Sequence, residues 1–258
     1  MSMKRTTFSF LILALCTVAI FALNHGGVSS RIQGKAFDLA HDRFPLHVLK
    51  TTGDVYALWQ EKKAHGRIVV HLGKYLHFTE SQVSSGTAGQ FFPQISTVAR
   101  DHLHYRMHQA SYRNFLWNAF QANIARRLYN VIPLPDFMQR FGLNDANDAQ
   151  KEITEKFAAS DIYDGAQRIF TARIPQIKEP VLLNIDASFF ASTDATQLFE
   201  SLMKSGLKSD LVTICLSEDN PDVTDIERQR LRTFLGLLSQ RAEILPTTLS
   251  SASSTATQ

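Results

Sequence analysis

The sequence predicts an α/β domain of three layers, in which a mostly parallel central sheet carries helices on both faces. Several short segments, residues 68–72, 181–185 and 211–216 among them, are almost continuously apolar, which is typical of strands buried on both faces. Segments with helical spacing of apolar residues separate these strands, and such alternation is typical of parallel sheets. A hydrophobic fraction of 44% in 258 residues supports a core of this size.

The first half of the chain contains two predicted helices, over residues 54–64 and 112–123. Both repeat apolar residues at intervals of three and four positions, which places those residues on one face. Pro133 ends the last strand of this half, because proline cannot donate a hydrogen bond to a neighbouring strand. The predicted strands of this half cover residues 46–49, 68–72 and 127–132.

The second half continues the alternation with three more strands and three more helices. Asp194 stands at the start of one helix, where its side chain can accept hydrogen bonds from the first backbone N–H groups. Thr224 or Asp225 caps the last helix in the same way. The predicted strands cover residues 168–174, 181–185 and 211–216, and the predicted helices cover residues 145–159, 194–205 and 225–240.

The chain divides into a targeting segment with its linker over residues 1–30, one domain over residues 31–246, and a disordered tail over residues 247–258. Lys4 and Arg5 precede an uncharged apolar run over residues 6–23, which we interpret as a membrane anchor or signal helix. The basic N-terminal flank predicts an inner-membrane protein whose domain lies on the periplasmic side. The alternative is a cleaved signal peptide and secretion to the periplasm.

Other function classes find no support in the sequence. A net charge of +3 without a block of basic residues argues against nucleic acid as a partner. The chain has no Gly-x-Ser-x-Gly motif and no glycine-rich phosphate loop ending in Gly-Lys-Ser/Thr. Its two cysteines lie in apolar segments, where free buried thiols are the expected state.

The expected binding crevice lies beyond the carboxyl ends of the strands, as is general for sheets of this kind. Four residues stand directly at such ends and should therefore share one rim, although they are far apart in the sequence. They are His71, Pro133, Asp186 and Ser217.

Two strand ends carry side chains that suggest a metal site with most of its ligands replaced. Residues 68–78 run from an apolar strand into a polar segment that contains His71, Gly73, Tyr75 and His77. Residues 181–190 run from a second apolar strand into Asp186 and Ser188.

These segments resemble the site segments of the arginase/deacetylase-like fold group, and we interpret the chain as a degenerate member of an uncharacterised arginase-like domain family. In the arginase-like metallohydrolases the two segments read approximately D-x-H-x-D and D-x-D, and their side chains hold a metal pair. The resemblance covers roughly residues 44–230. It rests on the order of five segments, residues 46–59, 68–78, 114–133, 181–190 and 216–222.

The departures from this pattern decide what the resemblance implies. A metal pair needs several carboxylates, but Gly73 has no side chain and Ser188 offers only a neutral hydroxyl. Tyr75 is a poor ligand near pH 7, because the ordinary pKa of tyrosine is about 10. The remaining candidate metal ligands are His71, His77 and Asp186.

We therefore expect a non-catalytic or highly diverged member of this fold, a pseudoenzyme that binds a small-molecule or protein ligand at the rim and needs no cofactor. The alternative is a metal-dependent hydrolase of C–N bonds with a rebuilt site for a single Zn or Mn ion. Its candidate catalytic residues are His71, Asp186 and Glu218, with Glu218 as the proton carrier. In either case Asp186 should be partly buried and should accept hydrogen bonds, from the turn at residues 188–190 or from His71.

Overall fold

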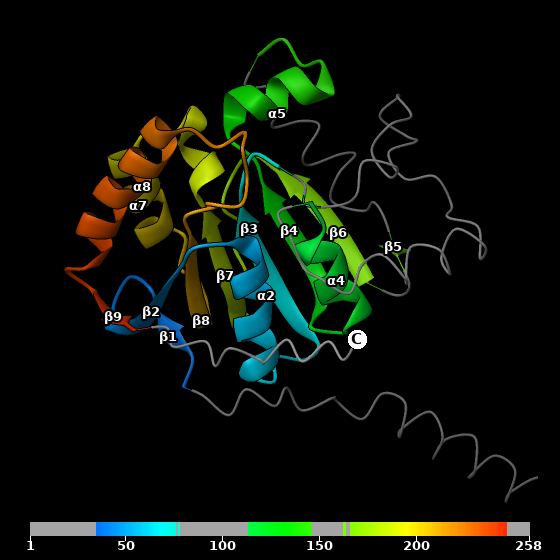
Figure 1. Cartoon of the computed structure of the whole chain (residues 1–258), viewed down its shortest axis with the longest axis vertical. Helices are drawn as coiled ribbons and strands as arrows, with labels where there is room; N and C mark the ends of the chain where they lie inside the picture. The colour runs from blue at the N-terminus through cyan, green and yellow to red at the C-terminus, as the bar shows by residue number, and fades with distance from the viewer. Residues whose placement is uncertain (1–34, 76, 78–112, 146–161, 164–165, 247–258) are drawn as a thin grey trace, which may run out of the picture. The chain divides into compact units, whose positions relative to one another are not determined.

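A nine-stranded sheet forms the centre of the fold (Figure 1). The computed structural model describes residues 35–75, 77, 113–145, 162–163 and 166–246, all within the unit that runs from Ile32 to Gln258. The predicted anchor over residues 6–23, the tail, and nearly all of the helix predicted at 145–159 lie outside the described residues. Among the described helices, none is long and apolar enough to cross a membrane.

The sheet is mostly parallel, as predicted. Its strands lie in the order β5-β6-β4-β3-β7-β8-β2-β9, and β1 pairs with β8. Only the β1–β8 and β5–β6 pairs are antiparallel among the described strands. The strands are β1 (Phe37–Asp38), β2 (Phe44–Leu49), β3 (Arg67–Leu72), β4 (Ala125–Val131), β5 (Ile162–Tyr163), β6 (Ala166–Thr171), β7 (Val181–Asp186), β8 (Lys208–Cys215) and β9 (Ala242–Leu245).

Helices cover both faces of the sheet, which gives the three predicted layers (Figure 1). Successive residues of β3 point to opposite faces, so Val69 packs with one set of helices and Val70 with the other. One layer consists of α2 (Thr52–Glu61) and α4 (Phe115–Gln121), and the other of α7 (Ala195–Lys204) and α8 (Asp225–Leu238). All six residues of β3 and of β7 are buried, which accounts for their continuously apolar pattern.

Five elements were not predicted: one helix, one short 3-10 helix over residues 187–191, and the strands β1, β5 and β9. Helix α5 (Leu134–Phe141) follows β4 directly, and Pro135 lies in its first turn, where the missing N–H group has no intrahelical partner to lose. The prolines therefore begin a helix as well as ending a strand. Among the unpredicted strands, β9 is a short edge strand beside β2, and β1 and β5 have two residues each.

The boundaries of several elements differ from the predicted ones by two or three residues. β6 ends at Thr171 rather than at residue 174, because the Thr171 hydroxyl accepts a hydrogen bond from the backbone N–H of Arg173 (3.1 Å) and the chain turns there. α2 ends at Glu61, two residues before Lys63 adopts a left-handed conformation with φ of 54°.

Between the neighbouring strands β3 and β7 lies a topological switch point, because the connections that follow these two strands lead in opposite directions along the sheet. From β3 the chain continues to its neighbour β4 on one side, and from β7 it continues to its neighbour β8 on the other. Loops that leave the carboxyl ends of two such strands diverge and leave a crevice between them. The two segments singled out by their sequences, after β3 and after β7, therefore flank one topological switch point.

Candidate functional site

The predicted rim residues share the carboxyl edge of the sheet. Strands β4, β3, β7 and β8 are consecutive neighbours, so the residues at or just beyond their carboxyl ends lie along one edge. These residues are Pro133, His71, Asp186 and Ser217, in the order of the strands. A hydrogen bond from the Lys74 backbone N–H to the Ser188 hydroxyl oxygen (3.1 Å) joins the two segments at the switch point directly.

Asp186 is fully buried, and both of its carboxylate oxygens accept hydrogen bonds from the protein. Oδ1 accepts from the backbone N–H of Ser188 (2.8 Å), which caps the short 3-10 helix η3 (Ala187–Ala191). Oδ2 accepts a hydrogen bond from the hydroxyl of Ser217. The turn after the strand is thus a donor, as predicted. The second hydrogen bond comes from the end of β8 and not from His71. The register pairs His71 with Asn184, two residues before Asp186, whereas Asp186 pairs with Cys215 at the end of β8.

Ser217 is held in a left-handed backbone conformation at the end of β8, with φ of 51°. Its hydroxyl oxygen lies 3.4 Å from the sulfur of Cys215. Burial raises the pKa of the Cys215 thiol well above its ordinary value, and the nearby charge of Asp186 raises it further. From α8, Arg228 donates to the carbonyl oxygens of Leu216 (3.2 Å) and Ser217 (3.1 Å), so a fixed cation holds this turn.

His71 belongs to a buried row of polar side chains that crosses five neighbouring strands. Its Nδ1 lies 2.9 Å from the amide nitrogen of Asn184, and the amide oxygen of Asn184 accepts from the Thr213 hydroxyl (2.9 Å). In order across the sheet, the row consists of Asn130, His71, Asn184, Thr213 and His47. A buried network of this kind orients its members, so His71 is a hydrogen-bonded residue of the sheet.

His71 and His77 lie together against one aromatic ring. Their ring centroids are 4.8 Å apart in an edge-to-face arrangement. The Phe115 ring of α4 lies 5.5 Å from His71 and 4.8 Å from His77. Both histidines are buried, and His77 has a left-handed backbone with φ of 51°. The structure therefore brings together these two predicted ligands, packed on the α2/α4 side of the sheet.

The imidazole of His71 explains the glycine at position 73. A Cβ atom on Gly73 would lie 2.4 Å from His71 Nε2, closer than real Cβ atoms approach any neighbour. The ring cannot move away freely, because it bonds to Asn184 and packs on Phe115. A side chain at position 73 is thus excluded by the neighbour two residues before it.

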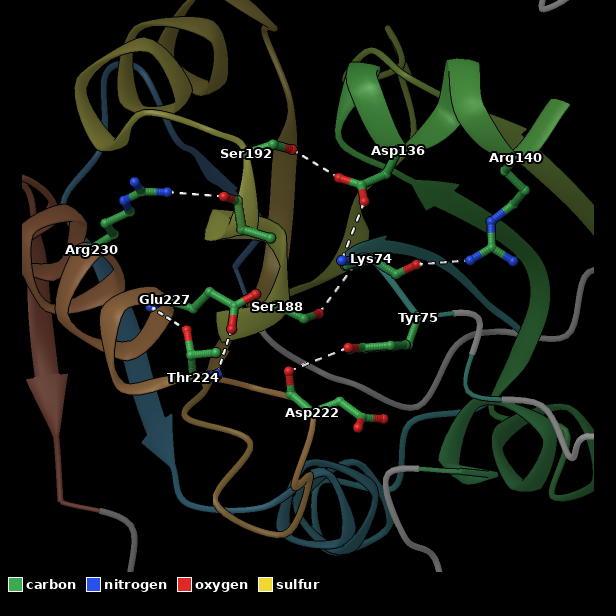
Figure 2. Close-up of polar contacts among 11 residues, drawn as sticks. Lys74, Tyr75, Asp136, Arg140, Ser188, Ser192, Asp222, Thr224, Glu227 and Arg230 are labelled. Atoms are coloured by element: carbon green, nitrogen blue, oxygen red, sulfur yellow. Dashed lines mark hydrogen bonds and ion pairs between the residues drawn. The ribbon is translucent and has the colours of Figure 1, made fainter. Parts of the chain in front are cut away.

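Tyr75 remains protonated near pH 7. Burial, together with the negative charges of Asp222 and Glu227, raises its pKa to about 12. Its hydroxyl donates to the backbone carbonyl of Asp222 (3.4 Å), which links the loop after β3 to the loop after β8 (Figure 2). The sequence argument that Tyr75 cannot supply an anionic ligand holds more strongly in the folded protein.

The residues present do not fit a metal pair. Within the described ranges, no three histidine, cysteine, aspartate or glutamate side chains are grouped so that they could hold a metal ion. Asp186 already accepts hydrogen bonds with both oxygens, and its neighbour Ser188 is neutral. Two adjacent imidazoles alone cannot balance the charge of two divalent ions.

Glu218 lies in an exposed turn. Its backbone N–H bonds to the carbonyl of Lys50 (2.9 Å) at the end of β2, and its side chain is exposed. The next residue, Asp219, accepts from the hydroxyl of Thr52 (3.1 Å) at the start of α2. This acidic segment therefore anchors a turn between β8 and α8, and Thr224 then caps α8 as expected.

Helix α5 contributes a set of polar contacts at the rim that we did not predict, and we call its contacts through Asp136 the Asp136 clasp (Figure 2). Asp136 pairs with the Lys74 ammonium group (3.4 Å) and accepts from the Ser192 hydroxyl (2.8 Å). From the same helix, Arg140 donates to the carbonyl of Lys74 (3.4 Å). The loops after β3 and β7 are joined in this way through one carboxylate. An acidic residue directly after Pro-x-Pro was the available signal, since acids favour a first helical turn.

A comparison of the chain with known family models, curated proteins and solved structures finds no match. The resemblance to the arginase-like family therefore stays a prediction from the sequence.

Proposed function

We propose that this protein is a non-catalytic, highly diverged member of the arginase-like metallohydrolase fold, which binds a ligand or partner at the carboxyl rim of its sheet. The observation that carries the proposal is the hydrogen bonding of the Asp186 carboxylate. Its two oxygens accept hydrogen bonds from Ser188 and Ser217, so it acts as a structural acceptor between two strand ends. A carboxylate used in this way would have to give up a buried hydrogen bond before it could coordinate a metal ion.

The surroundings of Asp186 support the same proposal. The ring of His71 occupies the space that a side chain at position 73 would need, and Tyr75 keeps its proton. The substitutions at these positions fit the packing and hydrogen bonding around them. Because these side chains are occupied in packing and hydrogen bonding, we favour ligand binding over catalysis at this rim.

One observation favours the alternative function, a hydrolase of C–N bonds with a single Zn or Mn ion. The observation is that His71 and His77 lie together, with ring centroids 4.8 Å apart, and neutral imidazoles are common zinc ligands. Asp186 would be the third ligand and Glu218 the proton carrier.

Metal analysis of the full-length protein, purified in a non-ionic detergent without chelator from cells supplied with zinc and manganese, separates the two functions. We expect both metals far below one equivalent. The matched variants His77→Ala and Ser217→Ala should leave that result unchanged. One tightly held equivalent of zinc or manganese that is lost in His77→Ala but retained in Ser217→Ala would replace the binding proposal by the hydrolase.

We further propose that the segment over residues 6–23 tethers the protein to a membrane. Its 18 uncharged residues follow Lys4 and Arg5, so we place the domain on the periplasmic side of an inner membrane, with secretion after cleavage as the alternative.

A further inference from the structure

A cavity of about 630 Å³ opens at the carboxyl edge of the sheet, on the side of α7. Its size lies within the range of small-molecule pockets, roughly 300–1,000 Å³. One wall consists of the loops that follow β4 and β6, and the other of η3 and α7. The Asp136 clasp borders it, because Ser192 both lines the cavity and donates to Asp136 (Figure 2).

The charges that line this cavity have one sign. Among the described residues that line it, the ionisable ones are Arg173, from the loop after β6, and Lys204, at the end of α7, and none is a carboxylate. Arg173 forms no ion pair with a described residue, and Lys204 pairs only with the exposed Glu200 (3.3 Å) one helical turn earlier. Exposed pairs of this kind are weak, about 0.2–1 kcal/mol, so an incoming anion can displace Glu200.

The remaining lining combines neutral donors with an apolar surface. The hydroxyl groups of Thr193 and Ser201 supply hydrogen-bond donors beside the two cations. Apolar side chains from four elements and one loop also line the cavity: Val131, Leu134, Ile174, Phe189 and Leu198. An occupant that satisfies both parts must carry an anionic group and an apolar group.

We infer that this cavity binds a small organic anion, a carboxylate or phosphate ester with an apolar or aromatic substituent. The inference rests on the proposed function, since it names the class of ligand held at the rim. The anionic group contacts Arg173 and Lys204, and the apolar group lies between α7 and the ends of β4 and β6. Because both cations are exposed, the affinity falls as ionic strength rises.

The test uses four probes of similar size on the full-length protein in a non-ionic detergent. Phenyl phosphate and benzoate are the anions, benzyl alcohol is neutral and benzylamine is cationic. Saturation-transfer NMR and calorimetric titration should show saturable binding of both anions, at least about tenfold tighter than the other two probes. Inorganic phosphate alone should bind more weakly than phenyl phosphate, because it lacks the apolar contact.

Two matched double variants locate the binding. Arg173→Gln with Lys204→Gln should weaken the anions about tenfold and leave benzyl alcohol unchanged. The control, Lys208→Gln with Arg232→Gln, removes the same charge from exposed positions outside the cavity lining and should change nothing. Ser201→Trp, at an exposed position of α7 that lines the cavity, should weaken the binding of every probe by occupying part of the cavity.

Each failure has a distinct meaning. Anion binding that is absent, unaffected by Arg173→Gln with Lys204→Gln, or weaker than benzylamine binding overturns the inference and leaves the metal-free rim proposal standing. A stoichiometric content of zinc or manganese that is lost in His77→Ala overturns the proposed function instead, independently of the result for anion binding.

Discussion

Asp186 is the residue at which the structure departs most clearly from a metal site. A buried carboxylate needs donors, and here one comes from the next turn and one from a different strand end. The need for donors followed from the position of Asp186 at the end of an apolar strand. The identity of Ser217 as a donor did not, because 31 positions separate the two residues and only the β7–β8 pairing brings them together.

We expect Asp186→Ala to lower the free energy of unfolding by about 1–3 kcal/mol, because it leaves buried donors without an acceptor. Asp186→Asn should have a smaller effect. Its amide oxygen can still accept from Ser188, and its nitrogen can donate to the Ser217 hydroxyl oxygen. Urea unfolding of the three proteins measures the difference.

Ser217→Ala provides the matched control for Asp186. If Asp186 acts through Ser217, the double variant Asp186→Ala with Ser217→Ala should be less destabilised than the sum of the two single variants. Equal stability of Asp186→Ala and the unchanged protein would mean that this carboxylate contributes nothing to folding, and would return Asp186 to the list of binding groups.

At the scale of elements, local sequence signals predicted most of the longer helices and strands. The observed ends differ from the predicted ends where a side-chain hydrogen bond or a left-handed residue stops the element. Asp194 caps α7 as its sequence indicates, by accepting from the backbone N–H groups of Thr196 (2.8 Å) and Gln197 (3.0 Å). α5 was missed because two prolines in three residues suggest a break, although both are compatible with the start of a helix. β9 was missed because four residues of mixed polarity are too few to show a period.

The cap of α7 also positions one wall of the cavity, so we expect Asp194→Ala to lower stability by about 1 kcal/mol. Asp194→Asn keeps the accepting oxygen and should lose only a few tenths, from the weaker interaction with the helix dipole. Thermal unfolding followed by circular dichroism compares them. Identical melting temperatures for Asp194→Ala and the unchanged protein would show that packing alone holds the first turn of α7.

At the scale of the whole molecule, the two charges before the apolar run make a prediction about topology. In spheroplasts, external protease should digest the domain if, as proposed, the positive charges of Lys4 and Arg5 hold the N-terminus on the cytoplasmic side. Lys4→Glu with Arg5→Glu should weaken this orientation and reduce digestion. A domain fully protected in intact spheroplasts but cleaved after lysis contradicts the periplasmic placement. Intact mass then distinguishes a retained anchor from a cleaved signal.

The sequence by itself determined the class of the fold and the edge at which to look for a site. Continuous apolar strands between amphipathic helices leave few arrangements other than a parallel sheet covered on both faces. In such a sheet the strand ends define a common rim. His71, Pro133, Asp186 and Ser217 could therefore be assigned to one edge without knowledge of the strand order.

Only the tertiary structure decided how these residues are used. The strand order set His71 beside Asn184 and Asp186 beside Ser217, and it left Gly73 no space for a side chain. It also gathered Arg173 and Lys204 around one cavity, although nothing in their local sequence links them. The physical reason is that local sequence controls backbone conformation, whereas hydrogen-bond partners and free volume depend on which strands become neighbours.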